Sequence, residues 1–313
     1  MSGTPRLELD ASGRALVEVG TQLRELGYRF TTVTPETHRR NNARTSAQEA
    51  RSLRDVFGWS RAFASDTLPP ALLDALRRAG AVEERDGRLS STVRFSTLGT
   101  GLYVHSAYPT LDEHAVFFGP DTYRFCALLD ARVAAARRCV DVCCGSGVGG
   151  LSLAARAQQI VLADVNPAAL RLARVNAHLA GVTDRVELAC GDLFAPVAGE
   201  VDLVIANPPY LLDAGHRVYR DGGGAIGEGL AVRIVREGLA RLARGGQLVL
   251  YTGAPIIDGR DRVREAIAPI LDAGAARWTY EELDPDVFGE ELELPAYAAV
   301  ERIAAVAAIA TVA

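Results

Sequence analysis

Residues 138–150 read Arg-Cys-Val-Asp-Val-Cys-Cys-Gly-Ser-Gly-Val-Gly-Gly, and this stretch decides the fold. The apolar run from Arg138 to Cys144 is typical of a short buried strand, and an Ala/Leu-rich helix follows the glycines. Glycines allow a tight turn and a close approach to a ligand, and the helix N-terminus behind them favours electron-rich groups. Gly145, Gly147 and Gly150 also satisfy G-x-G-x-x-G, so a dinucleotide-binding fold is an alternative here.

Acidic residues follow three of the expected strands. Asp141 lies at the end of the first, where a carboxylate suits a cofactor with a cationic ammonium group and suits a pyrophosphate badly. The strand over 159–163 ends in Asp164, which can accept hydrogen bonds from ribose hydroxyls, as it would in NAD enzymes. The strand over 186–190 leads to Asp192 and Leu193, whose carboxylate and backbone N–H could bind an adenine. The series predicts a nucleoside cofactor.

A fourth strand, 201–206, ends in Asn207-Pro-Pro-Tyr210. The prolines cannot continue a strand ladder, so they present the Asn207 side chain and the Pro208 carbonyl as a rigid pair of hydrogen-bond acceptors. The nitrogen of an amide or aromatic amine is a poor nucleophile because its lone pair is delocalised. Hydrogen bonds from its two N–H groups to these acceptors would favour the nucleophilic geometry, and Tyr210 offers a stacking face.

These four segments, in this order, resemble the class I S-adenosylmethionine (SAM)-dependent methyltransferases. The most similar subgroup holds the release-factor and ribosomal-protein glutamine methyltransferases together with adenine-N6 and some guanine-N2 enzymes. The resemblance covers residues 116–313. It implies an α/β fold with a Rossmann-like, seven-stranded, mostly parallel sheet and an antiparallel hairpin at one edge. Strands over 246–251 and 303–313 fit this expectation.

The resemblance also implies the roles of individual residues. SAM is the expected cofactor, S-adenosylhomocysteine the product, and no metal is expected. Gly119-Pro-Asp-Thr122 matches in part a segment that lies near SAM in the glutamine enzymes. The catalytic residues implied are Asn207, Pro208 and Tyr210, and the residues implied to bind SAM are Asp141, Cys143, Gly145, Gly147, Asp164, Val165, Asp192, Leu193, Asn207 and Thr122.

Residues 1–115 have a different pattern, so we place a domain boundary near residue 115 and assign 116–313 to the catalytic domain. The N-terminal domain is expected to be a smaller α+β unit that recognises or covers the substrate. Helical spacing predicts three helices, over 12–27 with Ser12 as its cap, over 45–57 and over 68–80. A β-hairpin is predicted around the turn Asp86-Gly87, between residues 81–85 and 88–95. Helices followed by a hairpin are similar to a winged helix.

The charge distribution bears on the acceptor. The net charge is −5, and residues 1–115, with 15 Arg against 14 acidic residues, contribute +1 of it. A protein that grips nucleic acid by its phosphates usually has a broad basic surface. Here only residues 38–61 are basic, and residues 281–295, which we expect to form a solvated loop, are strongly acidic. The basic stretch favours a nucleic-acid acceptor, whereas the overall acidity and the acidic segment disfavour one.

The leading hypothesis is therefore methylation of an amide or aromatic amine nitrogen, with a protein glutamine as the substrate. The alternatives are an RNA or DNA base (adenine N6 or guanine N2), a small molecule, and a non-catalytic SAM-binding protein. The five cysteines and five histidines show no metal-ligand spacing, so we expect packing or surface roles for His38, His105, His114, His178 and His216. The N-terminus lacks a secretory pattern and no segment is long enough to span a bilayer, which favours a cytoplasmic protein without membrane contact.

Overall fold

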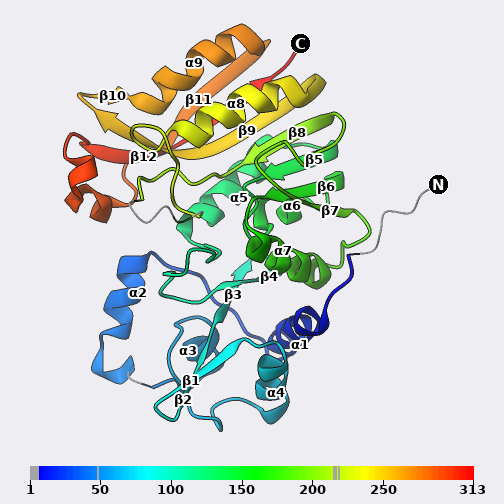
Figure 1. Ribbon diagram of the computed structural model, residues 1–313, viewed down its shortest axis with the longest axis vertical. Helices are drawn as coiled ribbons and strands as arrows, with labels where there is room; N and C mark the ends of the chain where they lie inside the picture. Colours follow the sequence, from blue (N-terminus) through cyan, green and yellow to red (C-terminus); the bar gives the residue numbers. More distant parts are fainter. Residues whose placement is uncertain (1–6, 48, 214–216, 218) are drawn as a thin grey trace.

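The computed structural model describes residues 7–47, 49–213, 217 and 219–313, and its centre is a mixed α/β sheet (Figure 1). In spatial order its main strands are β7 (Val186–Cys190), β6 (Ala157–Asp164), β5 (Ala136–Val142), β8 (Val201–Ala206), β9 (Leu242–Ile257), β12 (Arg302–Thr311) and β11 (Arg277–Asp284). The pairs from β7 to β9 are parallel, and β12 runs antiparallel to both β9 and β11. The short β10 (Arg260–Asp261) pairs with β9. The predicted parallel sheet with an edge hairpin is confirmed.

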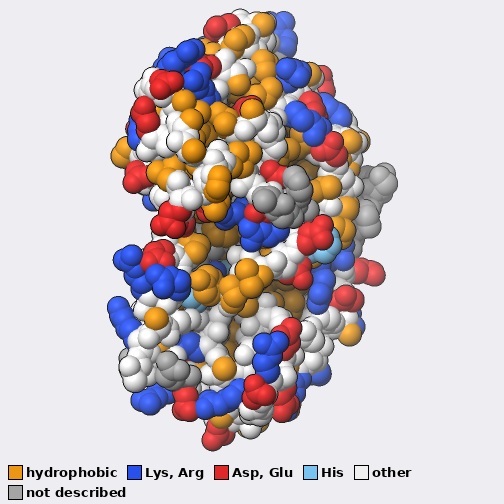
Figure 2. Space-filling model, turned by 60° about the vertical axis from the view of Figure 1, so that its left-hand side comes forward, with side chains coloured by type: hydrophobic (Ala, Val, Ile, Leu, Met, Phe, Trp, Pro, Cys, Tyr) orange, Lys and Arg blue, Asp and Glu red, His pale blue; other side chains and the backbone are white. Residues whose placement is uncertain are grey.

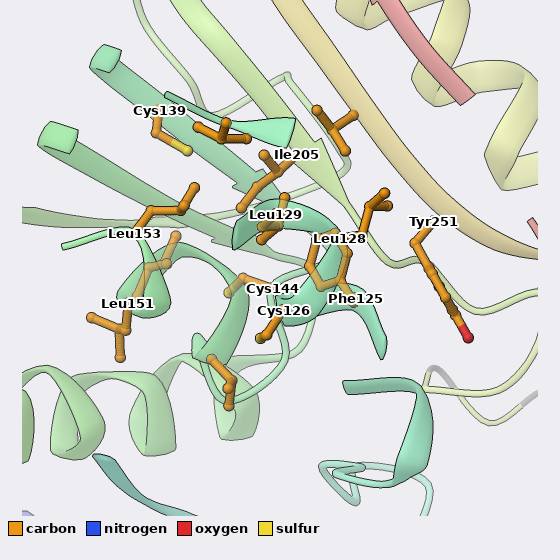
Figure 3. Packing of buried hydrophobic residues seen from close by; sticks show 14 of the residues in the cluster. Phe125, Cys126, Leu128, Leu129, Cys139, Cys144, Leu151, Leu153, Ile205 and Tyr251 are labelled. Carbon is orange, nitrogen blue, oxygen red and sulfur yellow. The ribbon is translucent and has the colours of Figure 1, made fainter. Parts of the chain in front are cut away.

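Helices cover both faces of this sheet. On one face lie α5 (Pro120–Arg132), α6 (Val148–Ser152) and α7 (Pro167–Ala180), and on the other lie α8 (Gly229–Arg241) and α9 (Arg262–Gly274) (Figure 1). Consecutive strand residues alternate between the two cores, as the period of a β-strand requires: Cys139 packs with the α5 side and Val140 with the α8 side. Figure 3 shows the α5 side, where Phe125 and Leu129 face Cys139 and Ile205.

The elements before α5 form a second group. It contains α1 (Ala11–Glu25), α2 (Pro35–Asn42), the 3₁₀ turn η1 (Thr45–Ala47), α3 (Leu53–Phe57), α4 (Pro70–Arg78), the hairpin β1 (Val82–Arg85) with β2 (Arg88–Ser91), and the hairpin β3 (Val93–Leu98) with β4 (Gly101–Ser106). Their core includes Val175 and Leu179 of α7, so α7 packs between this group and the sheet. The division at residue 115 and the winged-helix likeness stay predictions.

Three local expectations were wrong. The N-cap of α1 is Asp10, whose Oδ1 accepts from Gly13 N–H at 2.6 Å, because Ser12 instead donates to the Ala79 carbonyl. The predicted helix over 45–57 is broken into η1 and α3. The predicted strand over 88–95 is split, because the chain leaves β1 after Ser91 and pairs with β4 from Val93.

The acidic segment over residues 281–295 is also more than a solvated loop. Part of it is β11 itself, and the rest includes the 3₁₀ turns η2 (Gly289–Glu293) and η3 (Pro295–Tyr297). The Glu291 side chain is buried and forms an ion pair with Arg220. Arg124 pairs with Asp284 at 2.7 Å, Arg132 with Glu281 at 2.7 Å and Arg302 with Glu282 at 2.9 Å. Much of this negative charge is therefore compensated by the protein's own arginines.

Candidate active site

A cavity of about 380 Å³ lies at the carboxyl ends of β5, β6, β7 and β8. Open parallel sheets bind ligands at this edge. The cavity is bordered by the glycine loop, by Asn207–Leu211 after β8, and by segments from the N-terminal group that include Pro35 and Tyr108–Leu111. In Figure 2 the surface is hollowed between the upper and lower parts of the molecule, with hydrophobic and Arg side chains at the hollow.

The glycine loop adopts the left-handed backbone that its sequence predicts. Gly145 has φ 54° and Gly147 has φ 79°, and Cys143 between strand and loop has φ 58°. These values disfavour residues with a Cβ. A Cβ on Gly147 would also lie 2.8 Å from Leu162 Cδ1 and 3.2 Å from Ala173 Cβ. The loop is thus pressed onto β6 and α7, and α6 begins directly behind it.

Asp141 lies beneath this loop and is buried. Its Oδ2 accepts a hydrogen bond from Gly150 N–H at 2.7 Å. Burial raises the pKa of Asp141 to about 7, the Gly150 hydrogen bond opposes this rise, and the nearby Asp164 carboxylate adds to it. A cationic group that entered the cavity would favour the ionised carboxylate.

Asp164 holds the glycine loop and the next turn together. Its Oδ2 accepts from Gly145 N–H and its Oδ1 from Asn166 N–H, both at 2.8 Å. Burial raises the pKa of Asp164, and these backbone hydrogen bonds oppose the rise. Val165, next in the chain, borders the cavity with 54% of its surface exposed, so its apolar side chain is accessible to a ligand.

Thr122 and Cys143 also border the cavity. Thr122 Oγ1 accepts from Gly119 N–H at 3.3 Å and caps α5. Burial and the Asp164 carboxylate raise the pKa of the Cys143 thiol well above its ordinary value, so the thiol stays protonated.

Asp192 and Leu193 lie after β7, at the far end of the cavity. The Asp192 carboxylate accepts two hydrogen bonds from Arg233 of α8, at 3.1 Å and 2.8 Å, and this contact lowers its pKa. The Asp192 side chain is nevertheless 62% exposed, so it keeps acceptor capacity toward a ligand. Leu193 has φ 44°.

Asn207 follows β8 and borders the same cavity. Among the residues that the structure describes, none forms a hydrogen bond with its side chain. Pro208 and Pro209 border the cavity as well. That this loop faces the acceptor stays a prediction.

Tyr210 is more enclosed than a stacking residue needs to be. Its side chain is 7% exposed, and its phenol donates a hydrogen bond to Asp121 Oδ2. The ring makes an edge contact with Phe288 at 5.8 Å between centroids. Stacking on Tyr210 stays a prediction, with little free ring surface for it.

Three contributors to the site were not predicted from the sequence. Asp121 is buried on the cavity wall although it was noted only as part of a motif. Asn176 of α7 is buried and bonds with Val104 of β4 through both its amide atoms, and its Nδ2 also donates to the Ser146 carbonyl at 2.9 Å. The segment Tyr108–Leu111 borders the cavity, and the Tyr219 hydroxyl donates to the Thr110 carbonyl at 2.5 Å. Only the fold brings these together.

Other residues considered in the sequence lie away from the chemistry. His38 and His105 are buried in the N-terminal group, His178 contacts the Leu7 carbonyl at 2.6 Å, and His114 is exposed. His216 lies outside the described residues. Within the described ranges, no group of three His, Cys, Asp or Glu side chains could hold a metal ion, and no helix is long and apolar enough to cross a membrane.

Comparisons with known proteins agree with this geometry. Residues 122–256 match the family model described as methyltransferase small domain. Residues 122–256 therefore form a SAM-dependent methyltransferase domain. The cofactor of this domain is SAM.

Among curated relatives of the methyltransferase domain, the chain is 30% identical over 194 residues to ribosomal RNA small subunit methyltransferase C of Chromohalobacter salexigens, covering 58% of this chain and 52% of that one. It is 33% identical over 200 residues to release factor glutamine methyltransferase of Deinococcus radiodurans, covering 58% and 66%. The chain thus spans about half to two thirds of the length of these relatives. A crystal structure of M. jannaschii TYW2 in complex with AdoMet has a TM-score of 0.49 at 13% identity, covering 70% of this chain and 85% of that chain.

The residues around the cavity fit SAM chemically. Asp141 offers a carboxylate for an ammonium group, and the exposed Val165 offers an apolar face. The Ser146 hydroxyl borders the cavity but is buried and has no hydrogen-bond partner among the described residues. Since buried polar atoms are nearly always paired, this hydroxyl suits a polar group of a ligand.

Proposed function

We propose that this protein is an N-methyltransferase whose acceptor is an amide nitrogen, with a protein glutamine as the leading substrate. The observation that carries the proposal is the position of Asn207. Asn207 borders the same cavity as Asp141 and Asp164, and no described residue forms a hydrogen bond with its side chain. An amide acceptor that directly precedes two rigid prolines suits an –NH₂ group held toward the cofactor.

When bound, SAM supplies an electrophilic methyl group on a positively charged sulfur. The task of the protein is then mostly to position the acceptor, because in-line attack depends steeply on geometry. The Asn207 side-chain oxygen and the Pro208 carbonyl accept hydrogen bonds from the two N–H groups of the acceptor nitrogen. These bonds keep its lone pair available and stabilise the positive charge that develops on it. No base has to remove a proton before the attack.

The charge of the N-terminal group supports a protein acceptor over a nucleic acid. In the basic stretch 38–61, Arg39 and Arg40 both form ion pairs with Glu36, and Arg61 pairs with Asp55. Three of its six arginines are therefore paired within the chain, by the two carboxylates of Glu36 and Asp55. A continuous basic surface for phosphates would need them free.

A nucleobase acceptor is the second candidate, because one relative is a ribosomal RNA methyltransferase. The exocyclic amine of a base has the same N–H geometry as an amide. The loop Asn207–Tyr210 would serve it in the same way, so the chemistry alone does not separate the two acceptors.

The deciding experiment uses methyl-labelled SAM and a lysate of the source organism that lacks this gene. Wild type and Asn207→Ala are compared, and the label is divided by protease and nuclease digestion and by size. Asn207-dependent label in protein supports the proposal, and peptide mapping then locates the modified side chain. Label in RNA, DNA or small molecules would show that the substrate belongs to another class. Label that does not depend on Asn207 would refute the acceptor site.

A further inference from the structure

Asp121 has no assigned role, although its carboxylate is buried on the cavity wall with only 4% of its surface exposed. Three side chains satisfy it. The phenol of Tyr210 donates to Oδ2, the phenol of Tyr251 donates to Oδ1 at 2.8 Å, and Arg124 Nη1 lies 3.1 Å from Oδ1. A buried carboxylate is costly unless donors of this kind surround it, so their loss would leave it uncompensated.

These donors come from three separate elements. Arg124 belongs to α5, as Asp121 does, Tyr251 to the centre of β9, and Tyr210 to the end of the Asn207–Tyr210 loop. Figure 3 shows Tyr251 beside Phe125 of α5, on the side of β9 that faces this helix. Arg124 also reaches Asp284 of β11 at 2.7 Å. The carboxylate of Asp121 therefore connects the acceptor loop to α5 and to β9 of the sheet.

Besides this hydrogen bond, close contacts with neighbouring backbone restrict the position of Tyr210. A Cβ on Gly253 would lie 2.2 Å from the ring, which shows that the ring rests directly on the β9 backbone. On the other side of the residue, a Cβ on Gly227 would lie 2.2 Å from the Tyr210 carbonyl oxygen. Burial raises the pKa of Tyr210 well above its ordinary value and the Asp121 carboxylate adds to the rise, so the phenol stays protonated and donates.

We propose that Asp121 is a positioning residue for methyl transfer, which sets the acceptor loop by holding the Tyr210 phenol. Tyr210 is separated from Asn207 only by two prolines, whose φ angles are fixed. A displacement of Tyr210 is therefore passed on to the Asn207 side chain and the Pro208 carbonyl. Because in-line transfer is sensitive to small displacements, the loop needs an anchor outside itself. This inference rests on the proposed function of Asn207.

The chain offers a matched pair of variants to test it. Tyr210→Phe and Tyr251→Phe each remove one phenol that donates to the same buried carboxylate, but only Tyr210 lies on the acceptor loop. We expect the two variants to lower Tm by similar amounts and to keep the Kd for SAM, measured by calorimetry, within about twofold of wild type. The rate of Asn207-dependent labelling in the lysate should be about tenfold lower in Tyr210→Phe than in Tyr251→Phe.

Hydrogen exchange supplies a readout that needs no acceptor. Peptides covering 207–213 should exchange faster in Tyr210→Phe and in Asp121→Asn, and should be unchanged in Tyr251→Phe. Equal labelling rates and equal exchange in the two tyrosine variants would overturn the inference. If labelling by the wild type proved independent of Asn207, the proposed function would fall, whereas the exchange comparison would still decide whether Asp121 holds the loop.

Discussion

The cofactor side of the cavity comes from three successive strand ends, whereas the acceptor side is assembled from segments far apart in the sequence. On the first side, Asp141 and Asp164 lie at the carboxyl ends of β5 and β6, and Asp192 follows β7. On the second side, the loop after β8 meets Asp121 of α5, Tyr108–Leu111 and Phe288. The comparison teaches that a shared cofactor is served by a local, repeated pattern, while the acceptor depends on tertiary contacts that can vary without disturbing it.

The substitution with the largest expected effect disrupts the acceptor side alone. Asn207→Ala should lower methyl transfer by about 100-fold or more, because one of two groups that hold the acceptor nitrogen is lost. Its Kd for SAM should stay within about twofold of wild type. Labelling rate and calorimetry measure the two quantities. A similar loss in both would mean that the two sides are not separable at this residue.

Asp164→Ala should do the reverse. It removes the acceptor of the Gly145 and Asn166 N–H groups, so the glycine loop loosens and SAM affinity should fall by about tenfold or more.

Asp202→Ala is the matched control for Asp164→Ala, since Asp202 accepts from Arg137 and Arg138 N–H at 2.8 Å and 2.7 Å near the opposite ends of β5 and β8. Both variants should lose a similar amount of stability in thermal unfolding. Only Asp164→Ala should weaken SAM binding in calorimetry. Equally weakened binding in both variants would contradict a specific role of Asp164.

The pH dependence of SAM binding tests the role of Asp141 on the cofactor side. The pKa of Asp141 is raised from its ordinary value near 3.8 to about 7 by burial. In the protein without ligand, protonated Asp141 therefore favours folding below about pH 4, and this contribution is lost as the pH rises through 7. The ammonium group of SAM needs the ionised form, so binding should release a proton and strengthen by on the order of tenfold per unit between pH 5.5 and 7.

Calorimetry in buffers of different ionisation enthalpy measures that proton release. Asp141→Asn keeps an acceptor for Gly150 N–H but cannot ionise, so its weaker SAM binding should be nearly independent of pH over the same range. An unchanged pH profile in this variant would assign the titration to another group.

The smallest expected effect concerns the end of the cavity next to α8. Arg233→Ala removes both hydrogen bonds to Asp192, but the Asp192 side chain is largely exposed, so solvent replaces the guanidinium. SAM affinity in calorimetry should change by about threefold at most. A larger loss would show that Arg233 orients Asp192 for the adenine.

The sequence predicts most of the cofactor side because each contribution is local. A buried strand, a left-handed glycine turn and an acid occur within a few residues of one another, as at Val140–Gly147. The parallel sheet with its antiparallel edge hairpin was implied by the family resemblance of the same segments.

The acceptor side escaped prediction because its contacts join residues without local signals. Asp121 meets Tyr251 across 130 positions, and Thr110 meets Tyr219 across 109. The split between β2 and β3 was also missed, since residues 88–95 form a continuous run and only the edge of β4 draws Val93–Leu98 away.

The contact between Gly253 and the Tyr210 ring has a consequence for how related sequences can diverge. A glycine inside a central strand gives up strand propensity, and here the ring of a distant tyrosine fills the space that a side chain would take. Neither position can change by itself: a Cβ at 253 collides with the ring, and a smaller residue at 210 leaves a void beside β9. We therefore expect the two positions to covary in related sequences. A residue larger than Gly at position 253 should occur only together with a residue smaller than Tyr at position 210.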